Sequence, residues 1–120
     1  MKRNDSKQQT FNDGIVEIFS VGNIAAPGDM PKDGLTRKET LRFHRRTIGI
    51  VRYYTAMQAN QRVDAVLRCP FRAAVSAQDV ALFEGQQYKI KLVQRPEDIV
   101  PPVMDLTLER LGKAYAIKSG

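Results

Sequence analysis

Short runs in which apolar and polar side chains alternate constrain this chain more than any other feature of its sequence. In one run Leu41 and Phe43 alternate with basic residues, and in another the apolar positions are Met104, Leu106 and Leu108. A period of two residues places successive side chains on opposite faces of an extended backbone, which is the pattern of a β-strand buried on one face. Glycines and prolines separate the runs. The sequence therefore predicts short strands joined by turns.

About six segments fit a strand pattern, and one fits a helix. The predicted strands comprise residues 15–21, 41–46, 62–69, 80–83, 88–93 and 104–109. Two of them form a β-hairpin through the turn Glu84-Gly85-Gln86, with Tyr88, Ile90 and Leu92 facing inward. Apolar residues with the spacing of a helical stripe predict a short amphipathic helix at residues 50–59.

These elements predict a mostly β fold: a small antiparallel β-barrel or sandwich of about six strands with one short α-helix and a long loop. The length of 120 residues suits a single domain, which the pattern assigns to residues 14–111. Residues 1–13 are expected to form a flexible tail, and residues 112–120 a second short tail. The predicted core residues lie on the apolar faces of their strands and include Leu67, Cys69, Ile90, Leu92, Leu106 and Leu108.

Residues 22–39 are predicted to form the long loop of this domain. Three glycines and two prolines interrupt any regular pattern, and the large apolar residues Ile24, Met30 and Leu35 are widely spaced. Such sparse apolar side chains recover little of the entropy lost when a loop becomes ordered, so we expect the loop to be mobile in the isolated protein. Its apolar residues are then free to order against another subunit. We interpret Ile24, Met30 and Leu35 as residues of an assembly loop.

The composition excludes several classes of protein. A single cysteine, Cys69, leaves no intramolecular disulfide and no cysteine-rich zinc site, and it fits a reducing cytosol. No run approaches the roughly 20 consecutive apolar residues of a membrane span. Residues 1–10 are polar where a signal peptide has an apolar stretch. We expect a soluble protein that is not exported and does not contact a membrane.

The sequence contains no set of residues typical of a catalytic site. His44 is the only histidine, and it lies on the basic face of a predicted strand without a local acid or second ligand. Asp105 and Glu109 share one face of a strand, as two glycosidase carboxylates can, but Thr107 and Arg110 make an ordinary exposed face equally easy. Motifs for phosphate-binding loops, serine hydrolases, zinc proteases and dinucleotide binding are absent. We predict that the chain is not an enzyme and has no cofactor or metal.

The strongest functional cluster is a strip of basic residues with a single acid, Glu39, among them. We call it the basic strip, and its members are Arg37, Lys38, Arg42, Arg45, Arg46 and Arg52. The whole chain has 19 Lys+Arg against 13 Asp+Glu, and its net charge of +6 favours an acidic partner. That partner is either DNA, as for a nucleic-acid-binding barrel, or an acidic surface of a neighbouring protein. Charge alone does not choose between the two.

The order of short motifs along the chain resembles that of one protein family. The motifs are Arg46-Thr47-Ile48-Gly49, Tyr53-Tyr54-Thr55-Ala56, Gly85-Gln86-Gln87-Tyr88-Lys89-Ile90 and Met104-Asp105-Leu106-Thr107-Leu108-Glu109-Arg110-Leu111. Over roughly residues 40–111 the chain resembles the head-closure, or head-tail joining, proteins of long-tailed bacteriophages and prophages. The motifs are short and structural in character.

This resemblance implies a structural virion protein, made in the bacterial host cytoplasm, that assembles as a ring below the portal and its adaptor. The ring would help to retain the DNA in the head and would receive the tail. The implied partners are portal or adaptor proteins, a tail-terminator or tail-joining protein and identical subunits, with non-specific contact to DNA in the channel. A tail-side joining or completion protein of the same junction is one alternative, and a nucleic-acid-binding β-barrel is another.

Overall fold

The computed structural model describes residues 11–46 and 63–118 of the chain. Its strands are β1 (Gly14–Asn23), β2 (Asp33–Arg46), β3 (Ala65–Pro70), β4 (Val80–Phe83), β5 (Gln86–Gln94), β6 (Val103–Arg110) and β7 (Ala116–Ile117). The predicted helix at residues 50–59 lies outside the described ranges, as does the predicted N-terminal tail up to residue 10. Neither range contains a helix long and apolar enough to cross a membrane.

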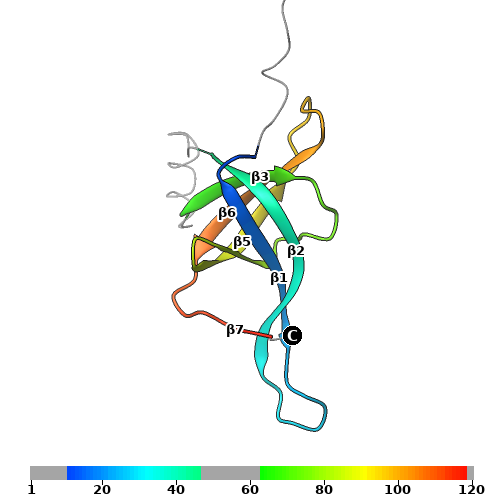
Figure 1. Ribbon diagram of the computed structural model, residues 1–120, viewed down its shortest axis with the longest axis vertical. Coiled ribbons are helices and arrows are strands. Elements are labelled where there is room, and N and C mark those ends of the chain that lie inside the picture. The colour runs from blue at the N-terminus through cyan, green and yellow to red at the C-terminus, as the bar shows by residue number, and fades with distance from the viewer. Residues whose placement is uncertain (1–10, 47–62, 119–120) are drawn as a thin grey trace, which may run out of the picture.

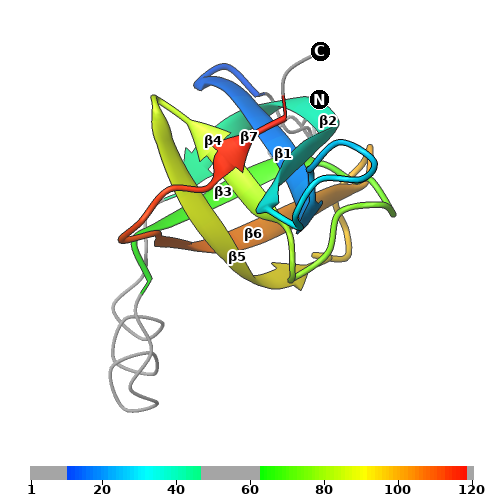
Figure 2. The same cartoon turned by 90° about the horizontal axis from the view of Figure 1, so that it is seen from below.

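One seven-stranded sheet contains these strands and closes on itself in a ring (Figures 1 and 2). The order of neighbours is β1-β4-β5-β6-β3-β2-β7, and an additional pairing of β1 with β2 completes the ring. Neighbours within the ring are antiparallel, whereas β7 pairs in parallel with β2. The ring departs from a regular barrel because β1 and β2 run on beyond it. The prediction of a mostly β, antiparallel fold is confirmed.

Alternate side chains of the strands fill the ring with an apolar core, as their period of two residues predicts. Five of the six predicted core residues are fully buried: Leu67, Cys69, Ile90, Leu106 and Leu108. Leu41 and Phe43 are buried in the same core, so the strands at 41–46 and 104–109 both direct their predicted apolar faces inward.

The predicted hairpin joins β4 to β5 through a two-residue turn. Glu84 and Gly85 occupy this turn with φ angles of 53° and 78°. Positive φ at both turn residues matches the right-handed twist of the flanking strands, and glycine adopts it without a steric penalty. The turn brings Phe83 and Tyr88 together in the core, where their rings stack with centroids 4.6 Å apart.

Leu92 is the predicted core residue that the structure places on the outside. The pairing of β5 with β6 shifts register between Ile90 and Leu92, so Lys91 is an extra residue in β5. Such a bulge moves every later side chain to the opposite face. Leu92 is consequently 45% exposed, and Val93 packs against the core instead.

Residues 22–39 do not form the predicted long loop. β1 and β2 extend into this segment from both sides, so the two strands form a long hairpin whose connection is limited to residues 24–32. β1 pairs with β4 no further than Phe19, and the end of the hairpin therefore projects from the ring (Figure 1). We call residues 20–36 the arm.

Local contacts explain why the glycine-rich arm is ordered. The Asn23 side-chain oxygen accepts hydrogen bonds from the backbone N–H groups of Ala25 and Lys32, each at 3.0 Å. Gly34 allows the two sides of the arm to approach, because a Cβ at this position would lie 2.3 Å from Ile24 Cδ1. This glycine is a site of close packing and does not break the strand.

The C-terminal segment belongs to the domain, and the prediction of a tail at residues 112–120 is wrong as far as the described residues extend. β7 pairs with β2 in the arm, and the Lys118 N–H donates a hydrogen bond to the Leu35 carbonyl at 2.8 Å. The Gln87 side chain binds Tyr115 twice: its Nε2 donates to the Tyr115 carbonyl at 3.0 Å, and its Oε1 accepts from the Tyr115 N–H at 2.8 Å. These contacts attach the segment to β2 and β5.

A second, smaller core lies at the base of the arm. Its buried members are Phe19, Leu35 and Val80, and Leu111 and Tyr115 from the C-terminal segment pack against them. Leu35 is fully buried in this cluster. The assignment of Leu35 to an assembly loop is therefore wrong, because its side chain already stabilises the folded chain.

Candidate functional site

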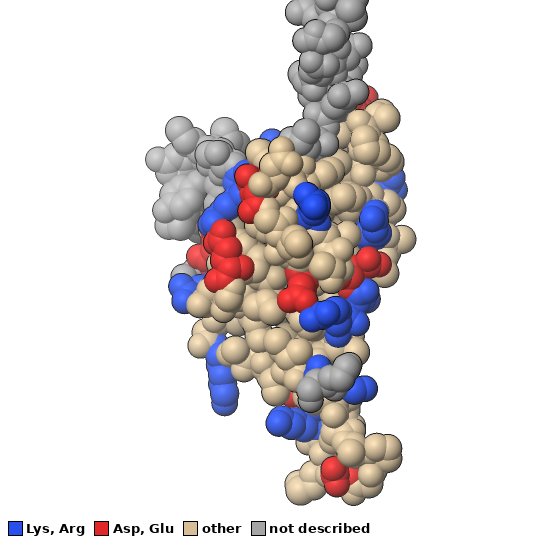
Figure 3. All heavy atoms as spheres, in the orientation of Figure 1, with Lys and Arg blue, Asp and Glu red and all other residues tan. Residues whose placement is uncertain are grey.

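Most of the basic strip is neutralised by carboxylates from other segments. Arg52 lies outside the described residues, and the other five members are in β2. Four of these have acidic partners: Arg37 with Glu17, Lys38 with Asp79, Arg45 with Glu84, and Arg46 with Asp105. Acidic side chains lie beside basic ones over the ring on the face seen in Figure 3. The described part of the strip is therefore not a continuous cationic surface.

Arg42 is the exception in the strip. It is exposed on β2, opposite Ile15 of β1, and it forms no ion pair with a described residue. A single exposed arginine supplies at most one of the several phosphate contacts that a DNA-binding surface uses.

Lys38 has a structural role. It is the extra residue of a bulge in β2, where the pairing with β1 shifts between Ile18 and Phe19. Its Nζ donates a hydrogen bond to Asp79 Oδ2 at 2.8 Å, and the same oxygen accepts from the Ser76 N–H at 2.9 Å. Asp79 is buried, so its charge depends on these donors. Lys38 thus joins β2 to the turn that precedes β4.

Asp105 is held by two arginines on the outer face of the sheet. Arg68 of β3 donates two hydrogen bonds to its carboxylate, from Nε at 2.8 Å and from Nη2 at 2.9 Å. Arg46 Nη1 approaches the same carboxylate at 3.9 Å. Asp105 is buried, although the alternation of its strand predicts an exposed position. The sequence does not reveal this pair, because its members are distant along the chain and meet only through the register of β3 with β6.

Asp105 and Glu109 each have a basic partner of their own. Glu109 accepts a hydrogen bond from Lys91 Nζ at 3.0 Å, and Asp105 is paired with Arg68.

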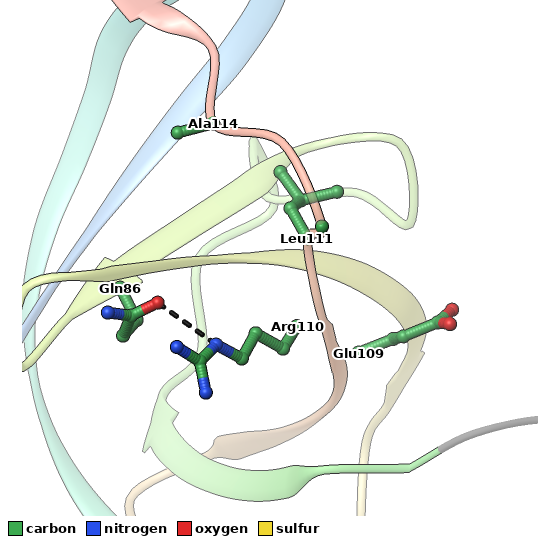
Figure 4. A pocket seen from close by; sticks show the side chains of 6 residues that line it. Gln86, Glu109, Arg110, Leu111 and Ala114 are labelled. Atoms are coloured by element: carbon green, nitrogen blue, oxygen red, sulfur yellow. Dashed lines mark hydrogen bonds between the residues drawn. The ribbon is translucent and has the colours of Figure 1, made fainter.

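Glu109 also borders an open hollow of about 580 Å³ at the end of β6. Within this hollow Arg110 Nε donates to Gln86 Oε1 at 3.0 Å, while the Glu109 carboxylate points away from both (Figure 4). The hollow therefore lacks polar groups that converge on one point.

His44 lies close to a carboxylate that also binds the backbone. Its Nδ1 is 3.2 Å from Asp13 Oδ2, and this oxygen accepts a hydrogen bond from the Arg45 N–H at 2.7 Å. Within residues 11–46 and 63–118 no group of three His, Cys, Asp or Glu side chains is placed to hold a metal ion.

Cys69 is sequestered in the core. Burial raises the pKa of its thiol to about 12, and the negative charge of Asp105 acts in the same direction. Because the thiolate is the reactive form of cysteine, this thiol is unreactive in the folded protein.

The arm and β7 expose several large apolar side chains. Met30, at the tip of the arm, is 85% exposed. Ile24 is half-buried, because its side chain packs against Gly34. Val21 of β1 and Ile117 of β7 are exposed as well. Of the predicted assembly-loop residues, Met30 is exposed and Ile24 is half-buried, and their role in assembly stays a prediction. Sequence analysis missed Val21 and Ile117.

A groove of about 410 Å³ runs between the arm and β7. Six of the eight residues that line it have apolar side chains, and the two charged ones are lysines: Ile24, Ala25, Ala26, Pro27, Lys32, Ala116, Ile117 and Lys118. A groove that combines apolar side chains with two lysines is suited to a peptide segment that carries both apolar and acidic side chains.

Comparison with protein-family models gives no match for this chain, and no curated protein matches it. The likeness to head-closure proteins therefore stays a prediction that rests on the sequence motifs.

Proposed function

We propose that this chain is a structural virion protein of a phage head-tail connector. In this role it forms a ring below the portal and adaptor, closes the DNA-filled head and provides a docking surface for the tail. Its partners are identical subunits, the adaptor above and a tail-terminator or tail-joining protein below. The proposal rests on the resemblance of the sequence motifs together with one structural observation, the projecting arm.

The arm supports protein binding because it exposes apolar side chains away from the ring. Of the six large hydrophobic residues exposed in the described ranges, Val21 and Met30 belong to the arm and Ile117 to β7 beside it. Exposed apolar side chains that gather in one place mark surfaces for binding other proteins. A hairpin anchored by a second core holds this surface in a fixed position, which lowers the entropy lost on binding.

The distribution of charge disfavours the nucleic-acid-binding alternative. The described ranges hold 14 of the Lys+Arg and 12 of the Asp+Glu residues, so they contribute only +2 of the net charge of +6. DNA affinity grows with the number of phosphates that cationic side chains neutralise. The ring and arm are close to neutral, and four basic residues of β2 already have acidic partners.

Deletion of the gene from a phage or prophage that carries it tests the proposal. DNA-filled heads and free tails are expected to accumulate separately in electron micrographs, and the wild-type chain supplied in trans should restore joined particles. Particles that join normally without the gene would refute a connector role.

A variant of the arm extends this experiment. Burying a methionine stabilises a contact by about 1.5–3 kcal/mol, so Met30→Ser should lower the yield of infectious particles by about tenfold or more. The matched control is Ile15→Thr, which alters an apolar side chain that is exposed outside the arm. Equal yields from the two variants would remove the arm from the assembly surface.

A further inference from the structure

The groove beside the arm contains two lysines without acidic partners among the described residues. Lys32 and Lys118 line it, and neither forms an ion pair with a described residue. Asp29 and Asp33 also belong to the arm, but neither lines the groove. An occupant with carboxylates beside an apolar side chain would pair with the lysines and pack against the apolar residues of the groove.

The loop between β5 and β6 has the complementary chemistry. Glu97 and Asp98 are exposed there, without an ion pair to a described residue, and they are followed by Val100, which is 72% exposed. Figure 1 shows this loop at the end of the molecule opposite the tip of the arm. The same chain therefore carries an acidic and apolar projection at one end and a basic and apolar groove at the other.

This loop is held in shape before any partner binds. The Arg95 guanidinium lies over the Phe71 ring, 4.1 Å from its centroid, and the Phe71 N–H donates a hydrogen bond to the Pro102 carbonyl at 3.1 Å. Pro96 and Pro101 restrict the backbone further. A segment that is already ordered loses little entropy when it docks.

We propose that residues 97–100 of one copy of this chain dock in the groove between the arm and β7 of the next copy. Glu97 and Asp98 then meet Lys32 and Lys118, and Val100 packs against Ile117. The two contacting surfaces are different parts of the chain, so the interface is heterologous and repeats from copy to copy. Such a contact closes into a ring when the rotation between copies divides a full turn evenly. This inference rests on the proposed ring assembly and names the contact between its subunits.

Disulfide trapping between two single-cysteine additions tests the contact. Val100→Cys and Ile117→Cys are prepared as separate full-length proteins, and the native Cys69 is buried and does not compete. On oxidation in concentrated solution, a mixture of the two is expected to give disulfide-linked heterodimers, while neither variant alone forms a disulfide-linked dimer. The double variant should give a ladder of covalent multimers. Leu92→Cys mixed with Ile117→Cys is the control for random collision and should give no more than background.

Two outcomes would overturn the inference. Dimers formed by Ile117→Cys alone would show that arms pair with arms in a symmetric contact, and a mixture no more cross-linked than the Leu92 control would show that the loop does not reach the groove. Neither result bears on the deletion experiment, which tests the connector role separately.

Charge reversal gives a second test in the same assay. Lys32→Glu with Lys118→Glu in the Ile117→Cys protein should lower heterodimer yield by about tenfold or more, because like charges then face each other. Adding Glu97→Lys and Asp98→Lys to the Val100→Cys protein should restore the yield by returning opposite charges to the contact. Circular dichroism confirms that each variant is folded. An unchanged yield after the first reversal, or no recovery after the second, would contradict the assigned pairing.

Discussion

Basic side chains that are adjacent in the sequence of β2 have separate roles in the folded chain. Lys38 supports a buried carboxylate, Arg46 helps to hold Asp105, and Arg42 alone is exposed without an acidic partner in the described ranges. The sequence predicts that these residues lie on one strand, but their partners come from segments that only the tertiary fold brings close.

Lys38→Met should destabilise the protein, whereas Arg42→Met should not. Removing the lysine leaves the buried Asp79 carboxylate with its hydrogen bond from Ser76 but without its counter-ion, which costs about 1–3 kcal/mol. Replacing an exposed arginine typically changes stability by less than about 0.5 kcal/mol. Urea unfolding of the two variants measures the difference. Equal midpoints would show that the Lys38 ion pair does not stabilise the fold.

Leu106→Ala should destabilise the protein much more than Leu92→Ala. Leu106 is fully buried in the ring, so its truncation should lower the free energy of unfolding by about 2–5 kcal/mol. Leu92 is displaced to the outer face by the bulge at Lys91, and its truncation should cost less than about 1 kcal/mol. Thermal and urea unfolding check both values. A large loss from Leu92→Ala would place that side chain in the core after all.

At the scale of elements, alternation predicts the positions of the strands well but not their lengths or interruptions. The hairpin turn at Glu84-Gly85 and the inward faces of β3 and β6 follow from local pattern. The bulges in β2 and β5 do not, because an extra residue leaves no local mark in the sequence. Residues 33–39 were predicted as loop because glycine and proline normally end strands. In the structure Gly34 instead permits a close approach of backbone and side chain.

Gly34→Ala should separate β7 from the arm. A Cβ at this position would lie 2.3 Å from Ile24 Cδ1 and 2.8 Å from the Ala116 carbonyl oxygen. Because the Lys118 N–H bonds to β2 in this region, its amide hydrogen should exchange with solvent faster in the variant. Hydrogen exchange read by NMR measures the effect.

Gly22→Ala is the matched control for this variant. Gly22 is the partner of Gly34 across the arm, and no atom lies within 4 Å of a Cβ built there. In the Gly22→Ala variant, the Lys118 amide hydrogen should exchange at the same rate as in the wild type. If Gly34→Ala also leaves this exchange unchanged, β7 does not depend on the close packing at Gly34.

At the scale of the whole molecule, the ring provides rigidity and the arm provides a surface. The ring is closed by pairing of β1 with β2, which leaves few strand edges exposed on its circumference. The same two strands continue outward as the arm (Figure 1), on which Val21 and Met30 are exposed. Sequence analysis located this segment and its exposed Met30, but it could not identify the groove, because β7 and the arm meet only in the folded chain.

The central claim is that the chain acts by joining a ring of protein subunits. Electron cryo-microscopy of the purified protein, mixed with the portal-adaptor complex of a phage that encodes it, tests this claim directly. We predict an added ring of density on the adaptor, built from copies of the β fold with their arms against neighbouring subunits. An unchanged portal-adaptor complex, together with tight binding of the chain to free DNA that weakens steeply with salt, would contradict the account.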